Sequence, residues 1–192
     1  MTWVIGNGQS RQNVKLDKLQ GSVVGCNALC RDFVADHLVC ADRRMVREAL
    51  TTDSPRIYTR ADWIHEFKKE TRVNTVPELP YKGKERPDQP FQWGSGPYAV
   101  LVGALTLSNK VNLLGFDLYS ETKNINNIYK GTQNYNKEDY RAVDPRYWIH
   151  QIGKVFKHHK AKQFIIYQKD GWELPKAWNY PNVSLDKISK II

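Results

Sequence analysis

The sequence lacks long hydrophobic runs and a basic leader ahead of an apolar core, and it has only three cysteines, Cys26, Cys30 and Cys40. The missing hydrophobic runs exclude a membrane-spanning helix, and the missing leader predicts a cytoplasmic protein without a signal peptide. An odd number of cysteines argues against a complete disulfide framework. The cysteines also lack the spacing and the histidine partners of a zinc site, so we expect buried structural thiols and predict no metal site.

Composition and charge describe an ordinary globular chain with a basic surface. The 192 residues are 41% hydrophobic and 26% charged, which is typical of one folded domain. The net charge of +9 favours an anionic partner (a nucleotide, a nucleic acid or an acidic saccharide), or else it only keeps the surface solvated. The basic residues are dispersed and no helix-turn-helix or RNA-binding signature is present, so no motif supports nucleic-acid binding. No pattern indicates the oligomeric state.

The chain begins with a short apolar run, residues 2–5, that ends in a turn with two glycines, Gly6 and Gly8. The run is too short for a helix, and its Val, Ile and Trp residues are typical of a buried strand. Glycines in the turn let backbone N–H groups approach a phosphate where a side chain would collide. The third glycine of the dinucleotide-binding fingerprint is missing and Arg11 follows Ser10, so a simple strand-to-loop turn remains an alternative.

Short apolar segments alternate with helical ones along the rest of the chain. We expect strands near residues 22–26, 37–41, 56–59, 72–76, 111–116 and 163–167, and helices near 43–50, 61–69, 98–107 and 144–157. A further short strand and helix are expected in the tail, 170–192. This alternation predicts an α/β domain with a mostly parallel sheet, flanked by helices on both faces. Two segments without periodicity, 77–94 and 120–140, are expected to be lid loops.

Polar residues stand where several of these elements begin or end. Asn7, Asn27 and Asp42 follow three strands, Ser95 is the expected N-cap of a helix, and Asp117 follows a later strand. Ligands of open α/β sheets bind outside the carboxyl ends of the strands, so these five residues should line one crevice. Each alone is commonly a turn or cap residue, and their recurrence is what favours a binding site.

Four motifs, in this order, resemble those of one protein family. The segments VIGNGQS (residues 4–10), GCN (25–27), GSGPY (94–98) and LGFDLY (114–119) look like motifs of bacterial lipooligosaccharide sialyltransferases. They also look like those of the related motility-accessory and pterin-pyrophosphokinase-like proteins. The resemblance covers roughly residues 2–165. It implies a single Rossmann-like domain, residues 1–192, that uses a CMP-linked nucleotide sugar as donor for glycosyl transfer and requires no further cofactor.

The resemblance also implies roles for residues of this chain. The turn residue Asn7 contacts the phosphate region of the nucleotide, Ser95 lies beside the cytidine, and Tyr129 binds phosphate from a loop. Asp42 stands where the family has an asparagine, and its carboxylate is suited to hold a ribose diol. The implied nucleotide-binding residues are Gly6, Asn7, Gly8, Ser10, Asn27, Asp42, Ser95, Gly96, Asp117, Tyr119 and Tyr129.

The chain departs from this family in its catalytic machinery. The family's general-base histidine lies a few residues before the late helix, whereas residues 137–143 of this chain contain no histidine. His150, about two turns into that helix, is the best substitute as catalytic base, although a half-buried structural histidine explains it as well. A non-catalytic nucleotide-binding module is therefore the alternative to a glycosyltransferase. The chain also lacks the family's membrane-associating C-terminal extension, as expected of a compact phage-encoded homologue.

Overall fold

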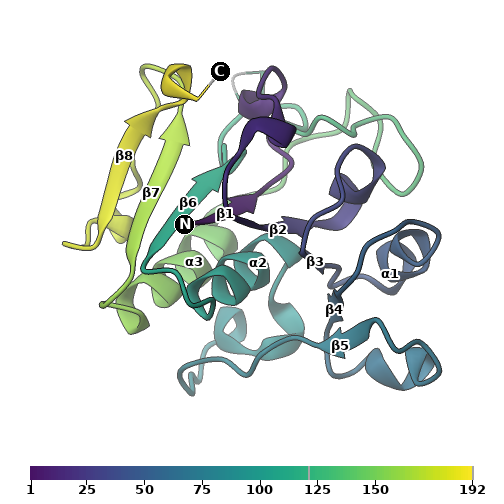
Figure 1. The fold of residues 1–192 in the computed structure, drawn as a ribbon. Coiled ribbons are helices and arrows are strands. Elements are labelled where there is room, and N and C mark those ends of the chain that lie inside the picture. Colours follow the sequence, from purple (N-terminus) through teal and green to yellow (C-terminus); the bar gives the residue numbers. More distant parts are fainter. Residues whose placement is uncertain (121, 192) are drawn as a thin grey trace.

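A computed structural model describes residues 1–120 and 122–191, in which eight strands form one sheet with every neighbouring pair parallel (Figure 1). The strands are β1 (Thr2–Ile5), β2 (Ser22–Cys26), β3 (His37–Val39), β4 (Ile57–Thr59), β5 (Val73–Thr75), β6 (Lys110–Leu114), β7 (Gln163–Gln168) and β8 (Val183–Lys187). Their order across the sheet is β5-β4-β3-β2-β1-β6-β7-β8. The predicted α/β class with a parallel sheet is confirmed, and the fold is Rossmann-like.

The strand order contains one switch point, beside β1. From β1 the chain steps outward through β2, β3 and β4 to β5 at one edge, then crosses back to β6 on the other side of β1. β1 and β6 pair from Thr2 opposite Val111 to Ile5 opposite Leu114. Because the connections leave these two strands in opposite directions, a crevice opens at their carboxyl ends, where doubly wound sheets bind ligands.

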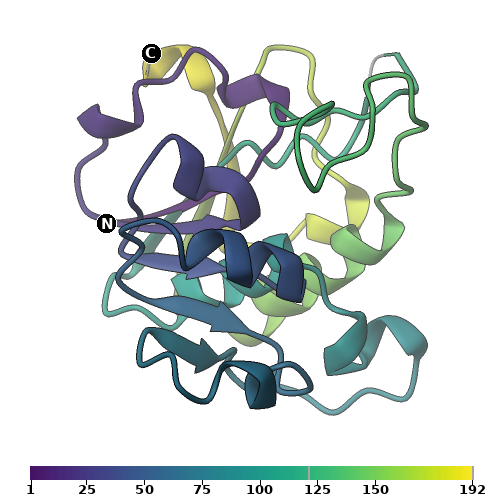
Figure 2. The same cartoon turned by 90° about the vertical axis from the view of Figure 1, so that its right-hand side faces the viewer.

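Helices cover both faces of the sheet, as predicted. The α-helices are α1 (Arg43–Ala49), α2 (Ser95–Ala104) and α3 (Arg146–His158). Successive strand residues point to opposite faces, so Val4 enters the core shared by α2 and α3, whereas Trp3 and Ile5 enter the core beneath α1. Figures 1 and 2 show α2 and α3 side by side on one face of the sheet.

Short 3₁₀ helices replace or extend several predicted elements. Those in the described chain are η1 (Gln9–Arg11), η2 (Leu16–Lys18), η3 (Asn27–Arg31), η4 (Ile64–Phe67), η5 (Arg86–Asp88), η6 (Pro90–Gln92), η7 (Lys176–Trp178) and η8 (Ile188–Lys190). The helix expected at 61–69 is only η4, flanked by turns. The N-cap of α2 is Gly94, so Ser95 as the N-cap was wrong: Ser95 is the first helical residue, and its hydroxyl bonds to Asn27 and Ala41 instead.

The two expected lid loops differ in their structure. Residues 77–94 contain η5 and η6, and their Trp93 is fully buried. Within residues 120–140, where residue 121 lies outside the described chain, no helix or strand is formed. The expected strand and helix of the tail are β8 and η8, apart from Ile192, which is also outside the described residues. None of the helices in residues 1–120 and 122–191 combines the length and apolar character needed to cross a membrane.

Candidate functional site

A cleft of about 460 Å³ lies at the carboxyl ends of β1, β2 and β6 and at the start of α2; we refer to it as the switch-point cleft. Most of the predicted nucleotide-binding residues meet there. Those that line it are Gly6, Asn7, Gly8, Asn27, Ser95, Gly96, Asp117 and Tyr119. Ser10, Asp42, Tyr129 and the predicted base His150 do not line it.

Gly6 and Gly115 let the ends of β1 and β6 approach each other closely. The N–H of Gly6 donates to the Leu114 carbonyl at 2.7 Å, and the N–H of Gly8 donates to the Gly115 carbonyl at 2.9 Å. A Cβ on Gly6 would lie 2.4 Å from the Gly115 oxygen, and Gly115 itself has a left-handed φ of +75°. Neither position therefore admits a larger residue without moving the floor of the cleft.

Arg11 stands near the position of the third glycine of the dinucleotide-binding fingerprint, and its side chain stabilises the turn that follows β1. Its side chain is buried, and Nε donates to the Gly6 carbonyl at 2.7 Å. Its Nη2 donates to the Tyr129 hydroxyl at 3.0 Å, and that hydroxyl donates to Asp32 at 2.5 Å. Burial, with the Asp32 hydrogen bond, raises the pKa of Tyr129. Tyr129 thus contacts Arg11 in the core. Tyr129 does not face the cleft, where the family resemblance had placed it.

Asp117 and Ser10 tie the ends of β6 and β1 together. The Asp117 carboxylate accepts from the Ser10 N–H at 2.9 Å and from the Ser10 hydroxyl. It also accepts from Gln168 Nε2 at 3.3 Å. A Cβ on Gly8 would lie 2.4 Å from Asp117 Cγ, so the glycine makes room for this carboxylate. The polar groups of Ser10 and Asp117 that were predicted to bind the ligand therefore bond to each other and shape the turn.

Asn7 carries the clearest free binding group in the cleft. Its side chain is only 8% exposed, and Nδ2 donates to the Cys26 carbonyl and to the Tyr135 hydroxyl, both at 3.2 Å. Its Oδ1 is buried and has no hydrogen-bond partner among the described residues. Buried amide oxygens are rarely left unpaired, so this atom is suited to accept a hydrogen bond from a ligand.

Ser95 joins the start of α2 to the ends of β2 and β3. Its hydroxyl donates to Asn27 Oδ1 at 2.7 Å and accepts from the Ala41 N–H at 2.8 Å. Asn27 has a left-handed φ of +49°, a conformation that asparagine tolerates better than most residues. The position of Asn27 after a strand and of Ser95 at a helix start in the sequence signalled their meeting, although not the hydrogen bond between them.

Asp42 acts as a helix cap, and Arg44 takes its predicted place in the cleft. Asp42 Oδ1 accepts from the Arg44 N–H at 2.8 Å, and Oδ2 accepts from Arg44 Nη2 at 2.7 Å. The Arg44 guanidinium lowers the pKa of Asp42. Arg44 lines the cleft and is the only arginine or lysine among the cleft residues in the described chain. Its position in the first turn of α1 was the available sequence signal.

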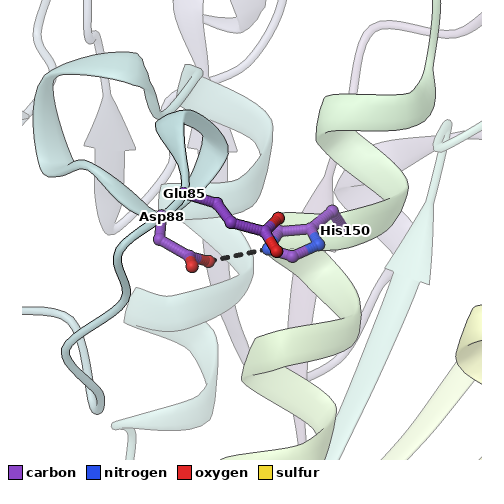
Figure 3. Close-up of side chains that lie close together, drawn as sticks. All are labelled: Glu85, Asp88 and His150. Carbon is purple, nitrogen blue, oxygen red and sulfur yellow. Dashed lines mark hydrogen bonds and ion pairs between the residues drawn. The ribbon is translucent and has the colours of Figure 1, made fainter.

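His150 faces away from the cleft. Its neighbours Trp148 and Ile152 on α3 line the cleft, and residues two apart on a helix do not share a face. His150 Nε2 instead lies 2.7 Å from Asp88 Oδ1, with Glu85 beside this pair (Figure 3). The structure therefore does not bring the predicted base to the predicted nucleotide site.

A second hollow, of about 720 Å³, adjoins the switch-point cleft beyond β7. Asp117 and Tyr119 line both spaces. The second hollow is also lined by Gln168, by Lys176 and by Trp172, whose Nε1 donates to the Asp117 carbonyl at 2.8 Å. A ligand that fills the cleft therefore has room to extend past Tyr119.

Tyr135 is the main site residue that the sequence analysis missed. It lies in the 120–140 segment, 128 residues from Asn7, and its hydroxyl meets both Asn7 and the Ala28 N–H. Only the Asn- and Tyr-rich composition of that segment pointed toward it.

Searches of protein-family models, curated proteins and solved structures give no match to this chain.

Proposed function

We propose that this protein binds a nucleotide or nucleotide sugar in the switch-point cleft. The observation that carries the proposal is the buried, unpaired Oδ1 of Asn7 at the carboxyl end of the central strand, beside the glycine turn. A ribose hydroxyl or a base amino group is the kind of donor that would pair with that oxygen, provided that the Asn7 side chain turns it toward the cleft. The cleft's place at the switch point of the sheet supports the same ligand class.

The start of α2 suits the phosphate of such a ligand. Ser95 and Gly96 occupy the first turn and line the cleft, and Pro97 has no N–H to satisfy. The first-turn N–H groups and the positive end of the helix dipole favour an anion. Arg44, whose guanidinium is paired with Asp42, also lines the same cleft and presents further N–H donors there. Cytidine as the base rests on the family resemblance alone.

Glycosyl transfer is the second candidate function. The adjoining hollow favours it, because a transferase needs room for an acceptor next to its donor. Lys169 and Lys176 line that hollow together with Asp170 and Glu173, so its charge does not by itself select an acidic saccharide. No histidine lines the cleft within the described residues, so the proposed enzyme has no assigned base, and nucleotide binding is the better-supported function.

A substitution in the first turn of α2 tests nucleotide binding. A Cβ on Gly96 would meet only Phe116 Cε1 at 3.5 Å, so a side chain fits there. Gly96→Asp places a negative charge where the phosphate is proposed, while a first-turn carboxylate stabilises the helix itself. We expect the affinity for CMP, measured by calorimetry, to fall at least about tenfold through charge repulsion. Gly96→Ala is the matched control and should bind CMP like the parent.

The ligand class is tested with a thermal-shift panel of CMP, a CMP-linked sugar and NAD. Binding to the folded state raises the melting temperature, by an amount that grows with the ratio of ligand concentration to Kd. We expect a shift with the cytidine ligands. An absence of any shift at millimolar nucleotide, or equal affinities of Gly96→Asp and Gly96→Ala, contradicts the proposal. Release of free sugar or CMP in the same samples would distinguish a transferase from a binding module.

A further inference from the structure

Outside the cleft, one group of side chains has the composition of a metal site. Glu85, Asp88 and His150 each offer one ligand atom, and these atoms all lie within 4.8 Å of one another. Figure 3 shows the two carboxylates and the imidazole pointing toward one another from two separate elements. In the described residues this is the one such group of histidine, cysteine and carboxylate side chains.

The local geometry explains why the three side chains meet. Glu85 is the N-cap of η5 and Asp88 is its last residue. A 3₁₀ helix has three residues per turn, so positions three apart lie on the same side. His150 stands on the face of α3 that is turned away from the cleft, and its Nε2 lies 2.7 Å from Asp88 Oδ1. The two carboxylates therefore project together toward one imidazole.

The Asp88 carboxylate is held in place by its surroundings. Asp88 is only 6% exposed, and a Cβ on Gly83 would lie 2.1 Å from its Oδ2, so the glycine makes room for the carboxylate. The buried Tyr81 hydroxyl lies beside the Asp88 carboxylate and interacts with it. Burial and the Asp88 carboxylate raise the pKa of Tyr81.

With the imidazole of His150 neutral, the group carries a net negative charge. Glu85 and Asp88 carry two negative charges, and Lys154 Nζ, 4.0 Å from Asp88 Oδ1, carries one positive charge. Lys154 also lies over the Tyr81 ring, 5.0 Å from its centre. Without a further cation, the group is an ion-pair cluster that ties η5 to α3. A divalent cation would compete with Lys154 for Asp88, and this competition can be measured.

We propose that Glu85, Asp88 and His150 bind a divalent transition-metal cation, with Zn²⁺ as the preferred ion. One imidazole favours zinc-like metals over Mg²⁺ and Ca²⁺, which prefer oxygen ligands. Three protein ligands leave a fourth position of a tetrahedral Zn²⁺ for water. Ligand atoms about 2.0–2.1 Å from a tetrahedral ion lie roughly 3.3 Å apart. The exposed Glu85 side chain must therefore swing inward, and the 2.7 Å contact between Asp88 and His150 must open slightly. The ion would fasten η5 to the helix that also lines the switch-point cleft through Trp148.

Zinc titration of the full, chelator-treated chain tests the proposal. We expect calorimetry to show one Zn²⁺ per chain and a rise in melting temperature with zinc. Glu85→Gln and His150→Gln should each weaken binding at least about tenfold. Lys154→Gln should strengthen it by about fivefold, because it removes a positive charge about 4 Å from a ligand. Glu85→Gln is the safer variant, since this exposed side chain takes no part in the Asp88–His150 contact.

His65→Gln is the matched control, because His65 is an exposed histidine on η4 outside the group. Its affinity for Zn²⁺ should equal that of the parent. Mg²⁺ at the same concentration should leave the melting temperature unchanged. The proposal is overturned if the parent binds no zinc, if Glu85→Gln binds as tightly as the parent, or if His65→Gln loses as much affinity as His150→Gln. None of the three proposed zinc ligands lines the switch-point cleft, so failure of either test leaves the other proposal intact.

Discussion

The Asp117 carboxylate, which follows β6, accepts hydrogen bonds from both the N–H and the hydroxyl of Ser10, which follows β1. Two strands that are far apart in the chain are thereby joined at their carboxyl ends. Gln168, at the end of β7, adds a third donor to the same carboxylate. This one side chain therefore links three adjacent strand ends at the wall between the cleft and the second hollow.

Asp117→Asn should lower the free energy of unfolding by about 1.5–3 kcal/mol, the range for hydrogen bonds to a charged group. The amide keeps the shape of the carboxylate but replaces one acceptor oxygen with a donor that faces the Ser10 and Gln168 donors. Urea unfolding followed by circular dichroism measures the change. Asp53→Asn, at an exposed position, is the control and should shift stability by less than about 0.5 kcal/mol. Equal effects of the two variants contradict this role of Asp117.

Gly8→Ala should destabilise the protein by about 1–3 kcal/mol, since its new methyl group would overlap the Asp117 carboxylate. The comparison with Gly96→Ala is informative because both variants add one methyl group. The new methyl group of Gly96→Ala makes only an ordinary contact with Phe116 on a helix, so this variant should be stabilised by up to about 1 kcal/mol. Thermal and urea unfolding of the pair check the prediction. The prediction is contradicted if Gly8→Ala unfolds at the same urea concentration and temperature as the parent.

His150→Ala should reduce stability without reducing nucleotide affinity. Removing the imidazole leaves the buried Asp88 carboxylate without its 2.7 Å partner, at a cost of about 1–3 kcal/mol. The cleft face of α3, at Trp148 and Ile152, is untouched. Unfolding in the presence of a chelator and CMP calorimetry are the two measurements. If His150→Ala keeps its stability but loses CMP binding or transfer, the result would instead support His150 as the base that the sequence predicted.

Lowering the pH should weaken the side-chain hydrogen bonds that hold the segment around Tyr135. Glu48 accepts from Arg31 and from Asn134, and Arg31 also donates to Thr132 at 2.6 Å. The Arg31 hydrogen bond lowers the pKa of Glu48 below its ordinary value. The unfolded chain therefore takes up this proton first, so the contribution of Glu48 to stability is complete above about pH 4.3 and is lost as the pH falls through the lower, folded-state pKa.

The Glu48→Gln variant isolates this contribution from that of the other carboxylates. Urea unfolding between pH 7 and pH 3 should show a smaller loss of stability in Glu48→Gln than in the parent. Arg31→Gln should reduce the same pH dependence, because it removes the partner that lowers the Glu48 pKa. Identical pH profiles of parent and Glu48→Gln would mean that the pair contributes nothing to folding.

Hydrogen exchange should separate the two expected lid loops. Residues 77–94 carry 3₁₀ helices and the buried Trp93, and Asp88 anchors them to α3. Residues 131–140 are mostly exposed and contain no regular element. We therefore expect amides of 85–93 to exchange more slowly than those of 131–140, and nucleotide to slow exchange near Tyr135, which lines the cleft. Faster exchange at 85–93 than at 131–140 contradicts this order.

The sequence by itself determined the α/β class, the buried first strand and the group of polar residues at strand ends and at the start of a helix. The run TWVI is buried at all four positions, and its length and composition alone predicted a strand. Asn7, Asn27 and Ser95 were placed together because parallel strands end at one edge of a sheet. These features depend on local periodicity and on a rule that holds for every open parallel sheet.

Only the tertiary structure decided which side chains face the ligand space. Whether His150 faces the cleft or η5 depends on the rotation of α3 about its axis, which packing against α2 and Trp178 sets. Tyr129 and Tyr135 lie in one segment, yet Arg11 draws the first into the core while Asn7 meets the second beside the cleft. Such contacts join residues that are about a hundred positions apart, and no pattern local to either partner encodes them, because their energy depends on both partners being in place.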